Sequence, residues 1–196
     1  MDLKSQIRST LAAMQTRAIS SGYDREAAVL MPVFERDREP HFLLTLRTEE
    51  VETHKGQISF PGGMRHGDER LEVTALRETR EEIGIDEERI EILGRFHDYV
   101  SSTDYRVVPF AGYVRSPFQV VPQPTEVAEV LTVPFSIFLD PGRLRTEKMM
   151  RRGKLIDVYF YSYSSYQIWG LTARIIRDFL AALRSAEGGQ PPPPRA

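Results

Sequence analysis

The sequence has no cysteine among its 196 residues. This absence excludes disulfide bonds, thiolate metal sites and cysteine nucleophiles, and it is typical of a reducing compartment. Long apolar runs are missing as well, because none approaches the about 18 consecutive residues that a membrane-spanning helix needs. The sequence therefore predicts a cytoplasmic protein that does not span a membrane.

The chain also has little excess charge of either sign, with 26 basic and 28 acidic residues. A formal net charge of -2 gives no general attraction to nucleic acid or to an anionic membrane surface, so we expect a small-molecule partner that is held locally. Length and composition suit one domain. We expect this domain over residues 1–187, followed by a disordered proline-rich tail over residues 188–196.

Apolar spacing predicts an amphipathic helix at the N-terminus, over residues 1–20. Two further helices are predicted over residues 68–83, with Asp68 as N-cap and Gly84 as the stop, and over residues 171–183. Strands are predicted at 25–35, 41–48, 56–60, 90–100, 105–114, 154–163 and 166–170. This order favours a mixed α/β sandwich with helices packed on a sheet.

The segment "RETREEIGI", residues 77–85, crowds Glu78, Glu81 and Glu82 on one sector of the predicted helix. Val73, Leu76, Thr79 and Ile83 fall on the other side, which we expect to be buried. Like charges at this spacing cost about 0.2–0.5 kcal/mol per pair, and one arginine, Arg77, can orient Glu81 but cannot neutralise all three. A solvated charged face is one interpretation, and a cation site is the other.

The preceding "FPGG", residues 60–63, favours the cation site. Two glycines let the main chain approach a ligand closely and expose its carbonyl oxygens. Carboxylates together with a backbone carbonyl form an all-oxygen donor set, which suits Mg²⁺ or Mn²⁺ better than zinc.

The longer stretch resembles the Nudix box, a loop-helix-loop signature. The match consists of Gly63, five residues, Glu69, seven residues, and then Arg77, Glu78, Glu81, Glu82 and Gly84. Thr79 is the one departure, since the family usually has a bulky aliphatic residue there. The resemblance implies an α/β/α sandwich with a mixed sheet and an enzyme that hydrolyses compounds in which a nucleoside diphosphate is linked to another group.

The resemblance also implies roles for individual residues. Glu78, Glu81 and Glu82 would bind the metal together with the carbonyl of Gly62, while Arg77 would orient Glu81. Glu69 would be a peripheral carboxylate. The family does not fix the general base, for which the sequence offers Glu126 and Glu129 in "PTEVAEV", with Glu126 as our choice; both are alternatively ordinary surface charges.

Residues upstream of the box resemble the extra motif of coenzyme A pyrophosphatases. The matching positions are Leu43, Leu44, Thr45, Arg47, Gly56, Phe60, Pro61, Gly62 and Gly63, and "IWGLTAR" at 168–174 is similar to that subfamily too. This implies cleavage of coenzyme A or acyl-coenzyme A to adenosine 3′,5′-bisphosphate and 4′-phosphopantetheine or its acyl form. Arg47, Lys55 and Arg65 are candidate phosphate ligands, whereas Thr48 and Glu52 depart from the motif.

Other functions and residues compete with these. ADP-ribose or another nucleoside diphosphate derivative is the alternative substrate, and a catalytically dead nucleotide sensor is disfavoured because every box carboxylate is present. His54 is a candidate substrate neighbour. Trp169 and the tyrosines around it would stack an adenine or, as the simpler interpretation, pack a core. A homodimer is compatible with the sequence.

Overall fold

The computed structural model describes residues 2–48, 56–186 and 188. Its helices are α1 (Leu3–Ala13), α2 (Leu71–Ile83), α3 (Phe135–Leu139) and α4 (Gly170–Ala186), with short 3₁₀ turns at Glu87–Arg89 and Pro141–Arg143. Its strands are β1 (Arg25–Arg36), β2 (Glu39–Arg47), β3 (Ile58–Ser59), β4 (Gly62–Met64), β5 (Ile90–Arg95), β6 (Tyr99–Val100), β7 (Tyr105–Val114), β8 (Val127–Pro134), β9 (Leu144–Arg151), β10 (Lys154–Tyr163) and β11 (Tyr166–Trp169).

The main sheet is mixed and is organised around β1. Strand β7 pairs with β1 in parallel, and β2 and β4 pair with it antiparallel. The last residues of β1 pair with β2 and its first residues with β4, so these two strands share one edge of β1. The neighbouring order β3-β2-β1-β7-β5 is extended by β8 on β2 and by β6 on β7.

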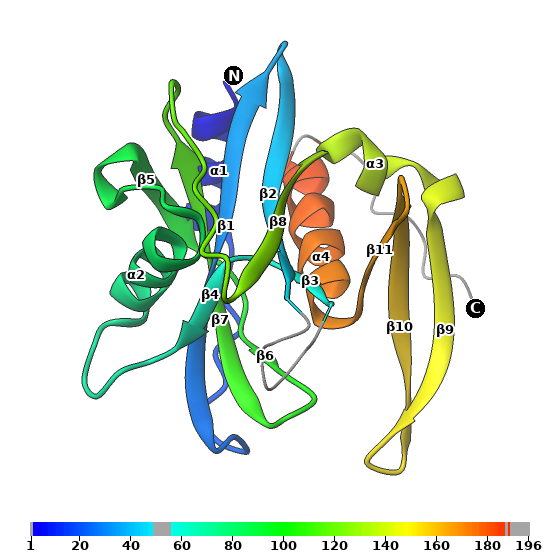
Figure 1. The fold of residues 1–196 in the computed structure, drawn as a ribbon. Coiled ribbons are helices and arrows are strands. Elements are labelled where there is room, and N and C mark those ends of the chain that lie inside the picture. The colour runs from blue at the N-terminus through cyan, green and yellow to red at the C-terminus, as the bar shows by residue number, and fades with distance from the viewer. Residues whose placement is uncertain (1, 49–55, 187, 189–196) are drawn as a thin grey trace.

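Helices cover both faces of this sheet (Figure 1). On one face Phe42 and Leu44 of β2 share a core with Ile7 of α1 and Phe179 of α4. On the other face Leu43 belongs to a second core, because successive strand residues point to opposite faces. That second core includes buried residues of α2, so the expected α/β/α sandwich with a mixed sheet is confirmed.

A second, three-stranded antiparallel sheet has the order β11-β10-β9 and stands beside α4 (Figure 1). Tyr161 of β10 is buried and meets Phe138 of α3 edge to face, with ring centroids 5.2 Å apart. This contact joins the small sheet to the core under α4.

The N-terminal helix is shorter than predicted, because α1 ends at Ala13 rather than at residue 20. The chain after it is held instead by the segment between β5 and β6. The Arg17 N–H donates to His97 Nδ1 at 3.0 Å, and the Ile19 N–H donates to the Asp98 carboxylate at 2.9 Å. The same contacts interrupt the strand predicted over 90–100, which is divided into β5 and β6.

Strands β8 and β9 and the short helix α3 were not predicted, and part of "FPGG" is a strand, β4, rather than a free turn. The proline-rich tail beyond residue 188 lies outside the described residues, so its predicted disorder stays a prediction. Among the helices of the described ranges, none is both long enough and apolar enough to cross a membrane.

Candidate active site

Helix α2 begins later than predicted. Its N-cap is Arg70, without a side-chain capping bond, while the expected cap, Asp68, is exposed and lies 3.8 Å from Arg65. The end of the helix is as predicted: Gly84 adopts a left-handed conformation with φ of 70° and donates its N–H to the Arg80 carbonyl. Glycine is favoured at such a position because it has no Cβ to clash.

The faces of α2 differ from the expectation at two residues. Thr79 and Ile83 are buried as predicted, but Val73 is 41% exposed. Glu82, expected on the exposed side, has a side chain that is only 3% exposed, compared with 52% for Glu81. The predicted carboxylate sector is therefore a boundary between core and solvent.

Strand β4 turns the backbone of Gly62 toward α2. Leu30 donates its N–H to the Pro61 carbonyl at 2.9 Å, and bonded positions alternate along an antiparallel ladder. The backbone groups of Gly62 consequently point away from β1. Met64, two residues on, accepts a hydrogen bond from Arg77 through its carbonyl at 3.2 Å, which shows that this side of β4 faces α2.

Glycine is required at both positions of the pair for steric reasons. A Cβ on Gly62 would lie 2.3 Å from the Ala28 carbonyl oxygen, so the strand could not approach β1. A Cβ on Gly63 would lie 2.4 Å from the carboxyl carbon of Glu78. The second glycine therefore provides the space that the Glu78 carboxylate occupies.

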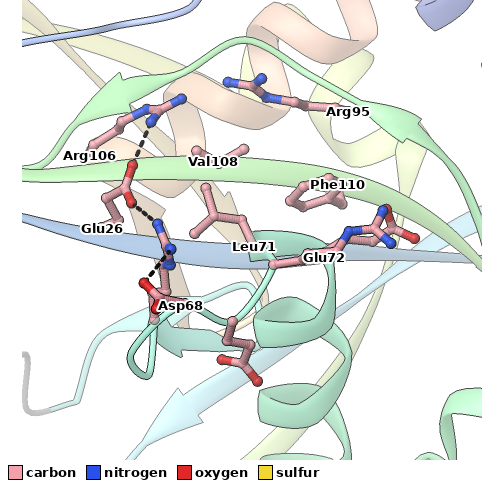
Figure 2. Close-up of a pocket in the computed structure, with 11 residues that line it drawn as sticks. Glu26, Asp68, Leu71, Glu72, Arg95, Arg106, Val108 and Phe110 are labelled. Atoms are coloured by element: carbon pink, nitrogen blue, oxygen red, sulfur yellow. Dashed lines mark hydrogen bonds and ion pairs between the residues drawn. The ribbon is translucent and has the colours of Figure 1, made fainter.

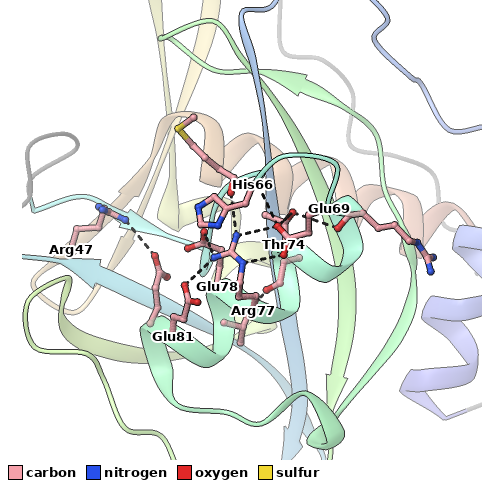
Figure 3. A network of polar contacts seen from close by, with 12 residues as sticks. Arg47, His66, Glu69, Thr74, Arg77, Glu78 and Glu81 are labelled. Carbon is pink, nitrogen blue, oxygen red and sulfur yellow. Dashed lines mark hydrogen bonds and ion pairs between the residues drawn. The ribbon is translucent and has the colours of Figure 1, made fainter.

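Arg77 connects the carboxylates (Figure 3). Its Nη1 donates to Glu78 and to Glu81, both at 2.9 Å, so the contact with Glu81 that the sequence predicted is present. Glu69 accepts two further bonds, from Nε at 3.0 Å and from Nη2 at 3.2 Å, and these hold the pKa of Glu69 down at about 2. Glu69, expected to be peripheral, is therefore the main anchor of the guanidinium.

Glu82 is the most deeply buried of the three box carboxylates. Arg47 Nη1 lies 3.5 Å from its Oε1, whereas its Oε2 is buried without a hydrogen-bond partner among the described residues. Burial raises the pKa of Glu82 to about 8, with Glu78 and Glu126 contributing in the same direction and Arg47 opposing them. Burial also raises the pKa of Glu78.

The two candidate bases lie on opposite sides of the main sheet. Glu126 is exposed, and its charge contributes to the raised pKa of Glu78 and Glu82, so it borders the carboxylates of α2. The Glu129 carboxylate instead accepts a hydrogen bond from the Tyr166 hydroxyl, on the α4 face. Glu129 therefore lies on the face of the sheet away from α2, and Glu126 is the candidate base that lies beside the carboxylates.

Two of the candidate phosphate ligands, Arg47 and Arg65, also lie in different places, although both lie near α2. Arg47 reaches the carboxylates from β2. Arg65 does not: it is paired with Glu26 at 2.5 Å and lines a cavity of about 420 Å³ on another flank of α2, where Arg106 pairs with the same glutamate (Figure 2). Lys55, His54 and Glu52 lie outside the described residues.

Trp169 stacks on Phe160 with their rings 6° from parallel and their centroids 5.7 Å apart. Since Phe160 is buried, this pair fits the packing interpretation of the aromatic cluster. Sequence reasoning missed Thr74, a buried threonine whose hydroxyl donates to Glu69 at 2.8 Å. A threonine five residues after a glutamate carries no signal by itself.

The donor set suits a hard divalent cation. As they stand, no three Asp, Glu or His side chains in the described ranges are close enough to chelate one ion. The chemistry nevertheless fits, because Glu82 has an oxygen without a partner and the Gly62 backbone faces the helix. Carboxylates also outnumber guanidinium groups, with Glu69, Glu78, Glu81, Glu82 and Glu126 against Arg47 and Arg77.

Comparisons with known proteins agree with this geometry. A model of the NUDIX domain matches residues 24–153. The chain is 38% identical over 159 residues to a protein of Photorhabdus laumondii described as an uncharacterized Nudix hydrolase, NudL, across 81% of this chain and 84% of that protein. It is 37% identical over 160 residues to Nudix hydrolase 22, chloroplastic, of Arabidopsis thaliana, across 78% and 53% of the two chains.

Among solved structures, the fold is similar to that of a Nudix hydrolase from M. smegmatis, RenU. The TM-score is 0.51 at 21% sequence identity, and the match covers 60% of this chain and 78% of that one. At this identity the similarity concerns the fold.

Proposed function

The chain belongs to the Nudix hydrolase family, and from this premise we propose that it hydrolyses the pyrophosphate bond of coenzyme A or acyl-coenzyme A. The products would be adenosine 3′,5′-bisphosphate and 4′-phosphopantetheine or its acyl form. The observation that carries the proposal is the position of Arg47. This arginine is one of the residues that resemble the coenzyme A pyrophosphatase motif upstream of the box, and its guanidinium lies 3.5 Å from Glu82, among the catalytic candidates.

The residues of α2 and β4 would form the metal site. Mg²⁺ or Mn²⁺ bound by Glu78, Glu81, Glu82 and the Gly62 carbonyl would neutralise the charge of the pyrophosphate and lower the pKa of a bound water. Arg77 holds Glu78 and Glu81 in place through one nitrogen. Phosphoryl transfer depends chiefly on such positioning and on charge neutralisation, so no side-chain nucleophile is needed.

Two other side chains complete the proposed reaction. Arg47 would donate to a phosphate oxygen of the substrate, since a guanidinium can bind phosphate through two parallel hydrogen bonds. Glu126, exposed beside the carboxylates, would accept the proton of the attacking water. Lys55 is retained as a candidate phosphate ligand.

ADP-ribose or another nucleoside diphosphate derivative is the second candidate substrate. One observation favours it: Arg65 is paired with Glu26 and lines a cavity that does not include Glu82, so one of the candidate phosphate ligands is engaged elsewhere. The proposal further comprises one domain over residues 1–187 and a cytoplasmic location. The proposal is compatible with a homodimer, and the molar mass of the protein in solution, measured by light scattering, distinguishes a monomer from a dimer.

A substrate panel tests the proposal. Purified protein with Mg²⁺ or Mn²⁺ would be given coenzyme A, acetyl-coenzyme A, dephospho-coenzyme A, ADP-ribose and NADH, and products would be separated by chromatography. We expect the highest kcat/KM for coenzyme A or its thioester, with a loss when the 3′-phosphate is removed. Turnover of ADP-ribose far above that of coenzyme A would contradict the proposed substrate and leave the metal-dependent hydrolysis in place.

A further inference from the structure

Thr74 makes a contact that its position in the sequence does not suggest. It lies in the first half of α2, is fully buried, and occupies none of the fixed positions of the Nudix box. Its hydroxyl donates to Glu69 Oε2 at 2.8 Å. The other acceptor within reach, the Arg70 carbonyl, is 3.4 Å away. The shorter hydrogen bond of the Thr74 hydroxyl is therefore the one to Glu69, which lies before the first residue of α2.

Glu69 receives this bond while both of its carboxylate oxygens accept from one edge of the Arg77 guanidinium. Its Oε1 accepts from Arg77 Nε at 3.0 Å, and its Oε2 accepts from Nη2 at 3.2 Å. The His66 N–H approaches Oε2 only to 3.4 Å. Among the described residues Thr74 is therefore the closest neutral donor to Glu69, and it restricts the rotation of the Glu69 carboxylate.

The remaining donors of Arg77 reach the proposed metal site. Nη1 donates to Glu78 and Glu81 at 2.9 Å each, and Nη2 donates to the Met64 carbonyl at 3.2 Å. A planar guanidinium fixes all of these directions together. A rotation of Glu69 would therefore turn Arg77 and shift both glutamates.

Thr79 shows how the hydroxyl of a buried helical threonine is ordinarily satisfied, which is by a backbone carbonyl of the same helix. The hydroxyl of Thr79, also fully buried on α2, donates back to the Ala75 carbonyl of its own helix at 2.7 Å. Such a bond satisfies the hydroxyl and connects it to nothing outside the helix. Thr74 differs because its acceptor is a carboxylate that contacts Arg77.

We propose that Thr74 is a positioning residue which, through Glu69 and Arg77, holds Glu78 and Glu81 in the arrangement that binds the divalent cation. The proposal rests on the metal site of the proposed function. Groups behind a metal ligand orient it, and their removal typically weakens metal affinity by about 10–100-fold. Two residues, Glu69 and Arg77, stand between Thr74 and the ligands, so the lower end of that range is expected.

The experiment measures Mn²⁺ affinity directly, by electron paramagnetic resonance of the free ion, in Thr74→Val, Thr74→Ser and Thr79→Val. Valine keeps the shape of threonine and removes the hydroxyl, whereas serine keeps the hydroxyl. We expect Kd for Mn²⁺ to rise about 10-fold in Thr74→Val and to stay close to wild type in Thr74→Ser and Thr79→Val. High Mn²⁺ should restore most of the lost turnover in Thr74→Val.

A double-mutant cycle with Glu69→Gln separates positioning from general destabilisation. If Thr74 acts through Glu69, Thr74→Val should add little to the loss of Mn²⁺ affinity already caused by Glu69→Gln. Equal effects of Thr74→Val in both backgrounds would overturn the proposal, as would wild-type affinity in Thr74→Val. If circular dichroism shows Thr74→Val to be unfolded, Thr74→Cys, which retains only a weak S–H donor, replaces it with the same expected direction.

Failure of the metal-dependent hydrolysis on which the proposal rests would appear differently. Wild-type protein would then bind no Mn²⁺ at the site and cleave no nucleoside diphosphate derivative, whereas a preference for ADP-ribose over coenzyme A would change the substrate alone. Failure of the positioning role alone would leave wild-type binding and cleavage intact and make the variants of the two threonines indistinguishable.

Discussion

Replacement of Glu82 by glutamine should stabilise the metal-free protein at alkaline pH while it abolishes activity. In the folded protein the pKa of Glu82 is raised by burial from its ordinary value of 4.5 to about 8. Between pH 4.5 and about 8, Glu82 is therefore still protonated in the folded state, whereas in the unfolded chain it has lost its proton. The free energy of unfolding of the wild type should fall as pH rises through this interval.

The magnitude follows from the size of the pKa difference. At about 1.4 kcal/mol per pKa unit, the change from 4.5 to about 8 corresponds to at most about 5 kcal/mol. Water penetration reduces such penalties, so we expect about 2–5 kcal/mol at pH 9. Glutamine carries no charge at any pH and has nearly the same shape, so the Glu82→Gln variant should escape this loss.

Urea unfolding with a chelator present, at pH 5, 7 and 9, measures the effect. The free energy of unfolding of Glu82→Gln relative to wild type should be lowest at pH 5 and increase steadily toward pH 9. Glu81→Gln is the matched control, because its side chain is 52% exposed and its replacement removes no desolvation penalty. Parallel stability curves for wild type and Glu82→Gln would refute the reasoning.

Three further predictions concern other parts of the site and the fold. Gly63→Ala should weaken Mn²⁺ affinity about 10–100-fold with the fold retained by circular dichroism, because its Cβ would lie 2.4 Å from the Glu78 carboxyl carbon; unchanged affinity would contradict this packing. Glu126→Gln should lower kcat by about 10²–10⁴-fold, whereas Glu129→Gln, on the other face of the sheet, should leave it unchanged; steady-state kinetics that rank the two variants in reverse would reject Glu126 as the base. Asp98→Asn should cost about 3–5 kcal/mol in urea unfolding at neutral pH with little effect on kcat, because this buried carboxylate is ion-paired on two sides; a change below about 1 kcal/mol would show that the pairs contribute little.

The chemistry of the site could be read from the sequence because it depends on local spacing. Glu78, Glu81 and Glu82 recur at helical intervals, and Gly84 ends the helix where a glycine is expected. The contact between Arg77 and Glu81 follows from the same spacing, four residues apart on one helix.

Burial within the site could not be read in this way. Helical spacing places Glu82 beside Glu81, but the packing of α2 against β1 and β4 leaves Glu82 buried and Val73 exposed. The side of the sheet taken by Glu129 depends likewise on the pairing of β8 with β2. Both depend on contacts between residues far apart in the chain.

The missed elements have similar physical causes. Strand β9 has six exposed residues in succession between its two ends, so it lacks the alternation by which a strand is predicted. Helix α1 ends at Ala13, and beyond it Arg17 and Ile19 bond to His97 and Asp98, about 80 positions away in the sequence, which helical spacing near the N-terminus could not reveal. Asp68 is not the N-cap, because α2 begins at Leu71, two residues later than a cap at position 68 implies; the Asp68 side chain lies near Arg65 instead.

The central claim is that the carboxylates of α2 direct water onto the pyrophosphate of coenzyme A. The most direct measurement is mass spectrometry of coenzyme A incubated with Mn²⁺ in ¹⁸O-labelled water, with wild type and Glu82→Gln in parallel. We expect wild type to form adenosine 3′,5′-bisphosphate and 4′-phosphopantetheine with one ¹⁸O atom in the phosphate of one of the two products, and Glu82→Gln to form them orders of magnitude more slowly. Intact coenzyme A with the wild type, or equal rates for both proteins, would contradict the central claim.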